Sequence, residues 1–254
     1  MLTSTSQASS STRAPAPSLR ARLHTVADAT RAALADPDDT QQAFRIADAL
    51  SFDNPQRMLR RFRRTDSGAR LLARRDDLLA VLTDRPRLEA MPEGSLAHAY
   101  LRFLDGEGIT AAGLVQASLD GVGATAADVD ARDPVAYVRT RMRDTHDLWH
   151  TVTGYRGDLL GEAALLAFTF AQTGNLGVGF LAGIGVVLGG VPGARRFIAQ
   201  GYARGRRATW MPPVDWVKLL PRPLDEVRRD LGITELPVYE PVRTHAVPAD
   251  AWPS

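Results

Sequence analysis

Apolar side chains recur every three or four residues along most of the chain, the spacing of one face of an α-helix. Leu19, Leu23 and Val26 begin the first such stripe, and Asp36-Pro37 ends it. Alternating apolar and polar positions, the pattern of a half-buried strand, are almost absent. The sequence therefore predicts an all-α protein, with a single-domain helical bundle over residues 18–232.

The longest helical pattern lies in the second half of the chain. Asp133-Pro134 is suited to open a helix and Gly154 to close it, which predicts one helix over 134–153. Asp158 begins the next helix, predicted over 159–172. A glycine-rich apolar helix is expected over 174–190, and its apolar run is shorter than the ~20 residues that a membrane-spanning helix needs.

The two ends of the chain differ in composition from the bundle. Residues 1–17 are rich in Ser, Thr, Ala and Pro and lack the apolar centre of a secretory signal. They predict a disordered leader of a bacterial protein, although an organellar transit peptide has a similar composition. Residues 233–254 read as a Pro-rich C-terminal tail.

Composition removes several classes of function. The 254 residues contain no cysteine, which excludes thiolate metal sites, disulfides and cysteine nucleophiles. The formal net charge is only +2, so we expect no nucleic-acid partner.

One cluster of polar residues suggests a metal site. His146 and His150 lie four positions apart, on one face of the predicted helix, and Asp147 adjoins them. After a glycine-containing turn the next helix brings Glu162, which an apolar run follows. An unpaired carboxylate in such a setting costs several kcal/mol and needs a compensating group. His146, Asp147, His150 and Glu162 would suit Zn²⁺, Mn²⁺ or Fe²⁺.

Two other interpretations of these residues stay open. The histidines could pack between helices while Glu162 pairs with Arg141 or Arg143. The pattern also approaches the His-Glu-x-x-His motif of zinc proteases, but here Asp147 stands where that motif has its catalytic glutamate. The shorter side chain disfavours a protease.

The spacing His146-Asp147-x-x-His150-x11-Glu162 resembles the signature of the coenzyme Q (ubiquinone) biosynthesis protein 4 family. Neighbouring segments agree with it, and the likeness runs from about residue 40 to 232. The resemblance implies an all-helical, membrane-peripheral protein that handles polyprenylated benzoquinone precursors and binds a divalent metal, usually described as zinc. The matching segments are Thr153-Gly154-Tyr155, Gly161-Glu162-Ala163 and residues 201–208, together with residues 92–96 and 223–228.

Two roles follow from the resemblance. The first is that of a metal-dependent carboxy-lyase that removes the C1 carboxylate of a polyprenyl 4-hydroxybenzoate-type precursor, with or without hydroxylation. Tyr155 and Asp158, in the turn beside the predicted ligands, are then candidate catalytic proton donors. The alternative is a non-catalytic, lipid-binding scaffold that organises the ubiquinone biosynthetic enzymes around a structural metal.

The resemblance also sets expectations about partners and location. We expect a polyprenylated precursor, other ubiquinone biosynthesis enzymes, a membrane surface and a second copy in a homodimer as partners. The prenyl chain could lie along the helix over 174–190. The expected location is the bacterial cytoplasm, peripheral on the inner membrane, with the matrix side of the mitochondrial inner membrane as the alternative.

Overall fold

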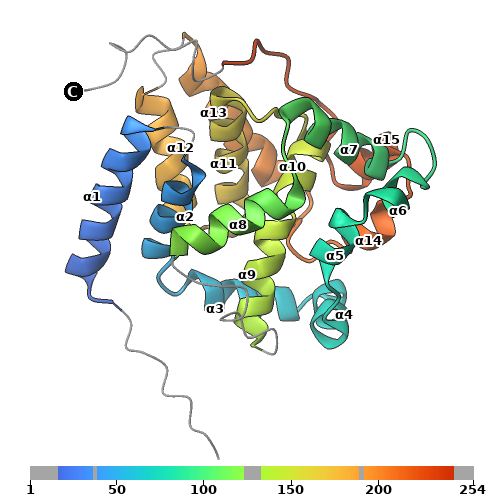
Figure 1. Ribbon diagram of the computed structural model, residues 1–254, viewed down its shortest axis with the longest axis horizontal. Coiled ribbons are helices and arrows are strands. Elements are labelled where there is room, and N and C mark those ends of the chain that lie inside the picture. Colours follow the sequence, from blue (N-terminus) through green and yellow to red (C-terminus); the bar gives the residue numbers. More distant parts are fainter. Residues whose placement is uncertain (1–16, 37–38, 123–132, 189–191, 243–254) are drawn as a thin grey trace, which may run out of the picture.

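The computed structural model describes residues 17–36, 39–122, 133–188 and 192–242 (Figure 1). Within these ranges every regular element is a helix, and one isolated bridge joins Ser95 to Pro223. The prediction of an all-α protein is confirmed. The leader expected at 1–17, apart from Pro17, and the tail beyond residue 242 lie outside the described residues. The helices are α1 Leu19–Ala35, α2 Thr40–Ala49, α3 Asn54–Arg63, α4 Asp66–Arg74, α5 Leu78–Thr83, α6 Arg85–Glu89, α7 Leu96–Glu107, α8 Ala111–Val122, α9 Pro134–Asp144, α10 His146–Thr153, α11 Leu159–Thr173, α12 Leu176–Leu188, α13 Ala194–Arg207, α14 Trp216–Leu219 and α15 Leu224–Asp230.

The largest hydrophobic core surrounds α10. Leu148 and Trp149 of α10 are buried there with Tyr100 of α7 and Phe168 of α11. The rings of Trp149 and Phe168 meet edge to face with centroids 6.0 Å apart. Burying large apolar rings on one side of α10 fixes the direction in which its polar side projects.

Two glycines let α13 lie directly against α11. A Cβ atom at Gly201 would overlap the carbonyl oxygen of Ala164, and one at Gly205 would overlap that of Phe168. Without side chains at these two positions the helix backbones approach closely. This packing anchors α11, the second helix of the candidate site, to the rest of the bundle.

The helix predicted over 134–153 is in fact two helices, and that prediction is corrected. α9 ends at Asp144, α10 begins at His146, and Thr145 joins them with ψ near zero. The hydroxyl of Thr145 donates to the carbonyl oxygen of Met142 at 3.2 Å, a local bond that competes with regular helix geometry. His146 therefore stands in the first turn of its own short helix.

The glycine-rich apolar segment forms α12, as its composition predicted. Gly177 of α12 packs against the backbone of α2 at Ala47, and Gly179 packs on the ring of Phe170. None of the helices in the described parts of the chain combines the length and apolar character needed to span a bilayer.

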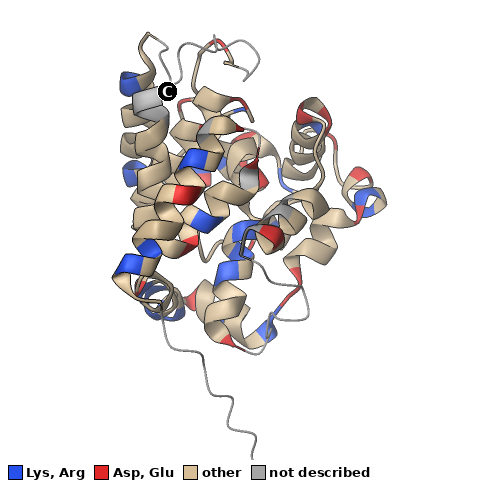
Figure 2. Cartoon of the chain, turned by 60° about the vertical axis from the view of Figure 1, so that its left-hand side comes forward, with Lys and Arg blue, Asp and Glu red and all other residues tan. Residues whose placement is uncertain are grey.

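Charges of both signs are interspersed over the bundle. Figure 2 shows Lys or Arg and Asp or Glu positions on the same helices. Several of them form exposed pairs, for example Arg85 with Asp105 and Arg222 with Asp230. Such pairs contribute little stability, since solvent screens them.

Candidate metal centre

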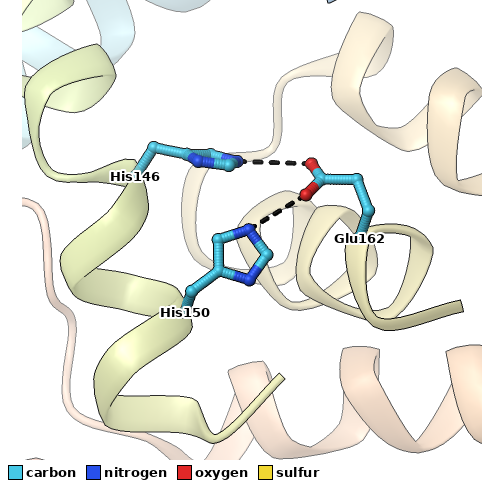
Figure 3. A group of neighbouring side chains, drawn as sticks. All are labelled: His146, His150 and Glu162. Carbon is cyan, nitrogen blue, oxygen red and sulfur yellow. Dashed lines mark hydrogen bonds and ion pairs between the residues drawn. The ribbon is translucent and has the colours of Figure 1, made fainter. Parts of the chain in front are cut away.

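The structure brings together three of the four residues predicted to bind metal. His146 and His150 project from α10 toward Glu162 of α11 (Figure 3). His146 Nε2 lies 3.3 Å from Glu162 Oε1, and His150 Nε2 lies 2.9 Å from Glu162 Oε2. One potential ligand atom from each residue falls within 4.8 Å of the others.

The turn between α10 and α11 makes this approach possible. Gly154 adopts φ 78°, a left-handed conformation that glycine tolerates, and closes α10 by donating its N–H to the carbonyl oxygen of His150. Asp158 then opens α11, since its carboxylate accepts the N–H groups of Leu160 and Gly161. Glu162 consequently returns beside the two histidines.

Asp147, the fourth predicted ligand, faces a different atom. Its Oδ1 lies 3.2 Å from Nδ1 of His146, whereas Glu162 approaches Nε2 of the same ring. The Asp147 side chain is buried, and it does not join the group formed by His146, His150 and Glu162. In this geometry Asp147 can orient the His146 ring from the side of Nδ1, opposite the nitrogen that faces Glu162.

His150 is held on three sides. Its Nδ1 lies 3.1 Å from the carbonyl oxygen of Tyr155, which can only accept a hydrogen bond. Phe103 of α7 stacks on the imidazole with centroids 5.0 Å apart, and the ring of His146 meets it edge-on. Nε2 of His150 is therefore the atom presented to a ligand.

The centre is partly open to solvent. The side chain of His150 is only 2% exposed, but those of His146 and Glu162 are 28% and 37% exposed. The sequence led us to expect a buried Glu162, but its side chain is half-buried, whereas residues 163–165 directly after it are buried. The Glu162 carboxylate extends from α11 to the solvent-exposed side of the site.

The arginine pairing considered for Glu162 is absent from the described residues. Arg141 donates instead to the carbonyl oxygen of Val214, and Arg143 pairs with Asp144. Glu162 has the two histidines as its partners. The alternative in which both histidines only pack between helices required Glu162 to pair with Arg141 or Arg143, and the structure shows neither pair among the described residues.

The electrostatics of the trio are strongly coupled. Burial alone lowers the pKa of His146, but the carboxylates of Glu162 and Asp147 outweigh it and raise that pKa to about 10. Burial likewise opposes ionisation of Glu162, yet His146 and His150 hold the pKa of its carboxyl well below the ordinary range. Both shifts favour a charged His146–Glu162 pair, whose Nε2 and Oε1 atoms lie 3.3 Å apart.

Tyr155 and Asp158, the candidate proton donors, occupy buried positions in the connecting turn. The Tyr155 ring lies between Phe197 and the guanidinium of Arg204. The Asp158 carboxylate caps α11 through its bonds to Leu160 and Gly161. Within the described residues no hydrogen bond joins the side chain of Tyr155 or Asp158 to the side chains of the candidate metal site. The catalytic role of these two residues stays a prediction.

Two residues near the site were missed by sequence analysis. Phe103 lies on α7, and nothing in the local sequence distinguishes it as the ring that stacks on His150. Tyr239 lies in the presumed tail, and its hydroxyl donates to Asp158 at 2.7 Å. A contact across 81 positions of sequence leaves no local signal.

The donor set suits a divalent transition metal. Two imidazole nitrogens and one carboxylate oxygen are a known ligand set of catalytic zinc sites and of non-haem iron sites. Zn²⁺, Fe²⁺ and Mn²⁺ all remain compatible with these atoms. The fold and the site together define an all-helical protein with a candidate two-histidine, one-glutamate metal centre.

This chain belongs to the coenzyme Q (ubiquinone) biosynthesis protein Coq4 family, whose family model matches residues 13–237. It is 31% identical over 180 residues to the mitochondrial ubiquinone biosynthesis protein COQ4 of Yarrowia lipolytica, covering 67% of this chain and 63% of that protein. It is 30% identical over 181 residues to the human mitochondrial COQ4 homolog, covering 70% and 64%. The alignments thus span less than two thirds of these relatives.

The fold has also been observed experimentally. A crystal structure of a protein from Nostoc punctiforme PCC 73102, described as a candidate ubiquinone biosynthesis protein, superposes with a TM-score of 0.62. The match covers 85% of this chain and 97% of that one at 22% identity. At this identity the likeness establishes the shared fold.

Proposed function

We propose that this chain acts in ubiquinone biosynthesis and binds a divalent metal, most simply zinc, through His146, His150 and Glu162. Family membership supports the pathway, because the curated relatives are named for it. The convergence of three ligand atoms from two helices supports the metal. Asp147 holds His146 in the orientation that turns Nε2 toward the site.

The proposed reaction is C1 decarboxylation of a polyprenyl 4-hydroxybenzoate-type precursor. A bound divalent cation would supply Lewis-acid binding of the substrate carboxylate. The bond between C1 and that carboxylate breaks, CO₂ leaves, and a proton is added at C1. The buried imidazole of His150, fixed by Phe103 and the Tyr155 carbonyl, would hold the cation, and with it the substrate carboxylate, in one position.

The partial exposure of His146 and Glu162 is the observation that carries the catalytic proposal. Structural zinc sites are closed by four protein ligands, whereas catalytic sites keep three and leave a position for substrate. His146 and Glu162 reach the surface side of this centre, with side chains 28% and 37% exposed. That arrangement favours turnover over the alternative of a scaffold with a structural metal.

Apolar surface on α12 supports binding of the polyprenyl chain. Leu176 and Phe180 are 54% and 40% exposed, on the glycine-rich helix where the chain was expected to lie. We further propose peripheral association with a membrane, on the cytoplasmic face in a bacterium, and assembly with other enzymes of the pathway and with a second copy of this chain. The relatives named above are mitochondrial proteins.

The test measures CO₂ release from a polyprenylated 4-hydroxybenzoate-type precursor by purified, zinc-loaded protein. Glu162→Gln keeps the side-chain size but removes the charge, and it should abolish both metal binding and release. Glu226→Gln, at an exposed Arg222 pair, is the matched control and should behave as wild type. Lack of release by wild type, with several precursors accumulating together on deletion, would support the scaffold instead.

A further inference from the structure

We infer that residues 235–242, here named the C-terminal strap, position the candidate metal centre by locking the turn that joins its two helices, and that Tyr239 is the principal positioning residue. The inference rests on the proposed metal site. It assigns a role in function to a segment that sequence analysis read as a tail.

Tyr239 ties both sides of the turn together. Its hydroxyl accepts the N–H of Arg156 at 2.9 Å and donates to Oδ2 of Asp158 at 2.7 Å. Its ring lies on Phe197 of α13, with centroids 4.6 Å apart. One side chain therefore links the end of the turn, the cap of α11 and a neighbouring helix.

The strap backbone adds a second connection to the same residues. The N–H of Val242 donates to Oδ1 of Asp158 at 2.9 Å, and the carbonyl oxygen of Val242 accepts the N–H of Leu159 at 2.9 Å. With its two helix-capping bonds, the Asp158 carboxylate has four donors and is only 2% exposed. Three of these bonds end on Oδ1, whereas the Tyr239 hydroxyl bonds Oδ2, so removing that hydroxyl takes a partner from a buried acceptor.

The strap also covers Gly154 at the end of α10 and Gly161 in the first turn of α11. Leu236 and Pro237 pack over Gly154, where a Cβ atom would stand 3.2 Å from each of them. A Cβ at Gly161 would meet the hydroxyl of Tyr239 and the carbonyl oxygen of Arg156. Gly161 immediately precedes Glu162, so the strap contacts the helix one residue from a proposed metal ligand.

This arrangement matters because the three ligand residues come from two helices, α10 and α11, that are joined by that turn. Any shift of α11 relative to α10 changes the separation of Glu162 from His146 and His150. Metal binding needs ligand atoms held within a few tenths of an ångström of their working positions. Hydrogen bonds from the strap hold the turn and the start of α11 in place. Their partners there are Arg156, Asp158 and Leu159.

The test compares the metal site of wild type and Tyr239→Phe in the full chain. Phenylalanine keeps the ring on Phe197 and removes only the hydroxyl. Zn²⁺ affinity, measured by competition with a chromophoric chelator, should fall by up to about tenfold. This is the lower end of the effect of losing a group bonded directly to a ligand, because Tyr239 acts on Glu162 through Asp158 and the turn. The visible spectrum of the Co²⁺-substituted protein should change as well, which a merely structural role would not produce.

Two further variants make the comparison sharp. Val242→Pro deletes the other bond from the strap to Asp158 and should also weaken Zn²⁺ binding. Tyr202→Phe is the matched control, since Tyr202 is a partly exposed residue of α13 whose ring contacts Phe170. It should leave affinity and spectrum unchanged. Melting temperatures confirm that each variant is folded at the assay temperature.

The outcomes separate this inference from the proposed function. If wild type binds metal and Tyr239→Phe binds it with the same affinity and the same Co²⁺ spectrum, the positioning role is wrong and the metal site stands. If wild type itself binds no Zn²⁺ or Co²⁺, the metal site is wrong and the inference falls with it.

Discussion

The Nδ1 atom of His150 lies 3.1 Å from the carbonyl oxygen of Tyr155, so a backbone group of the connecting turn fixes the tautomer of a proposed metal ligand. Because a carbonyl only accepts hydrogen bonds, Nδ1 carries the hydrogen and Nε2 faces Glu162. The same turn thus sets both where α11 begins and which nitrogen of His150 is available.

Replacing His150 should remove metal binding. We expect His150→Ala to lose at least about 100-fold in Zn²⁺ affinity, more than the loss of an outer-shell partner. His98→Ala is the control. His98 lies on α7, and its ring forms a hydrogen bond with the carbonyl oxygen of Glu89 at the end of α6. Elemental analysis of protein purified without chelator should give near one metal per chain for wild type and the control. Equal metal content in all three proteins would contradict the assignment.

Asp147→Asn distinguishes an orienting carboxylate from a direct ligand. If Asp147 only holds Nδ1 of His146, the variant should bind Zn²⁺ about 10- to 100-fold more weakly and keep the wild-type Co²⁺ spectrum in its main features. If Asp147 is a ligand, its loss should match that of His150→Ala. Asp225→Asn, at a side chain 91% exposed, serves as the control.

Removal of bound metal should destabilise the protein. At a free metal concentration of about 1,000 times the dissociation constant, binding to the native state adds about 4 kcal/mol. For a chain of this size that corresponds to a fall of roughly 8 to 16 °C in melting temperature after chelation. Differential scanning calorimetry with and without a strong chelator measures it. A melting curve that does not move, with metal loss verified, would argue against a site that binds the native state.

Stability of the metal-free protein should decline at alkaline pH. Burial lowers the pKa of His146, but Glu162 and Asp147 outweigh burial and raise that pKa from 6.5 to about 10. The contribution of His146 to stability is therefore complete below the unfolded pKa of 6.5 and is lost as pH rises toward 10. The melting temperature of chelated wild type should fall across this interval relative to His146→Ala. Parallel curves for the two proteins would refute the pairing.

Packing of α13 on α11 gives a stability prediction independent of metal. Gly201→Ala places a methyl group against the carbonyl oxygen of Ala164 and should cost about 1 to 3 kcal/mol. Gly183→Ala on α12 meets no atom within 4 Å and should stabilise its helix by up to about 1 kcal/mol. Urea unfolding of both variants checks the sign. A Gly201→Ala protein as stable as wild type would mean that α13 moves freely away from α11.

Local sequence determined the elements and most of the candidate site. Positions four apart share a helix face, so the spacing alone pairs His146 with His150. Gly154 and Asp158 carry the chemistry of a helix end and a helix start, which predicted the reversal that returns Glu162. The division of 134–153 at Thr145 was missed, because a Thr bond to the carbonyl of Met142 competes with the helix only weakly.

Only the tertiary structure decided which hydrogen-bond partner each polar side chain of the site has. Asp147 is adjacent to His146 in sequence, yet only the packed core shows that it faces Nδ1 and not the group of three donors. The sequence marks Asp158 as a candidate proton donor, but only the fold places the Tyr239 hydroxyl on its carboxylate, across 81 residues. The spacing of apolar residues shows which face of a helix is buried. Hydrogen bonds between distant segments depend on the path of the whole chain, which the spacing within one segment does not encode.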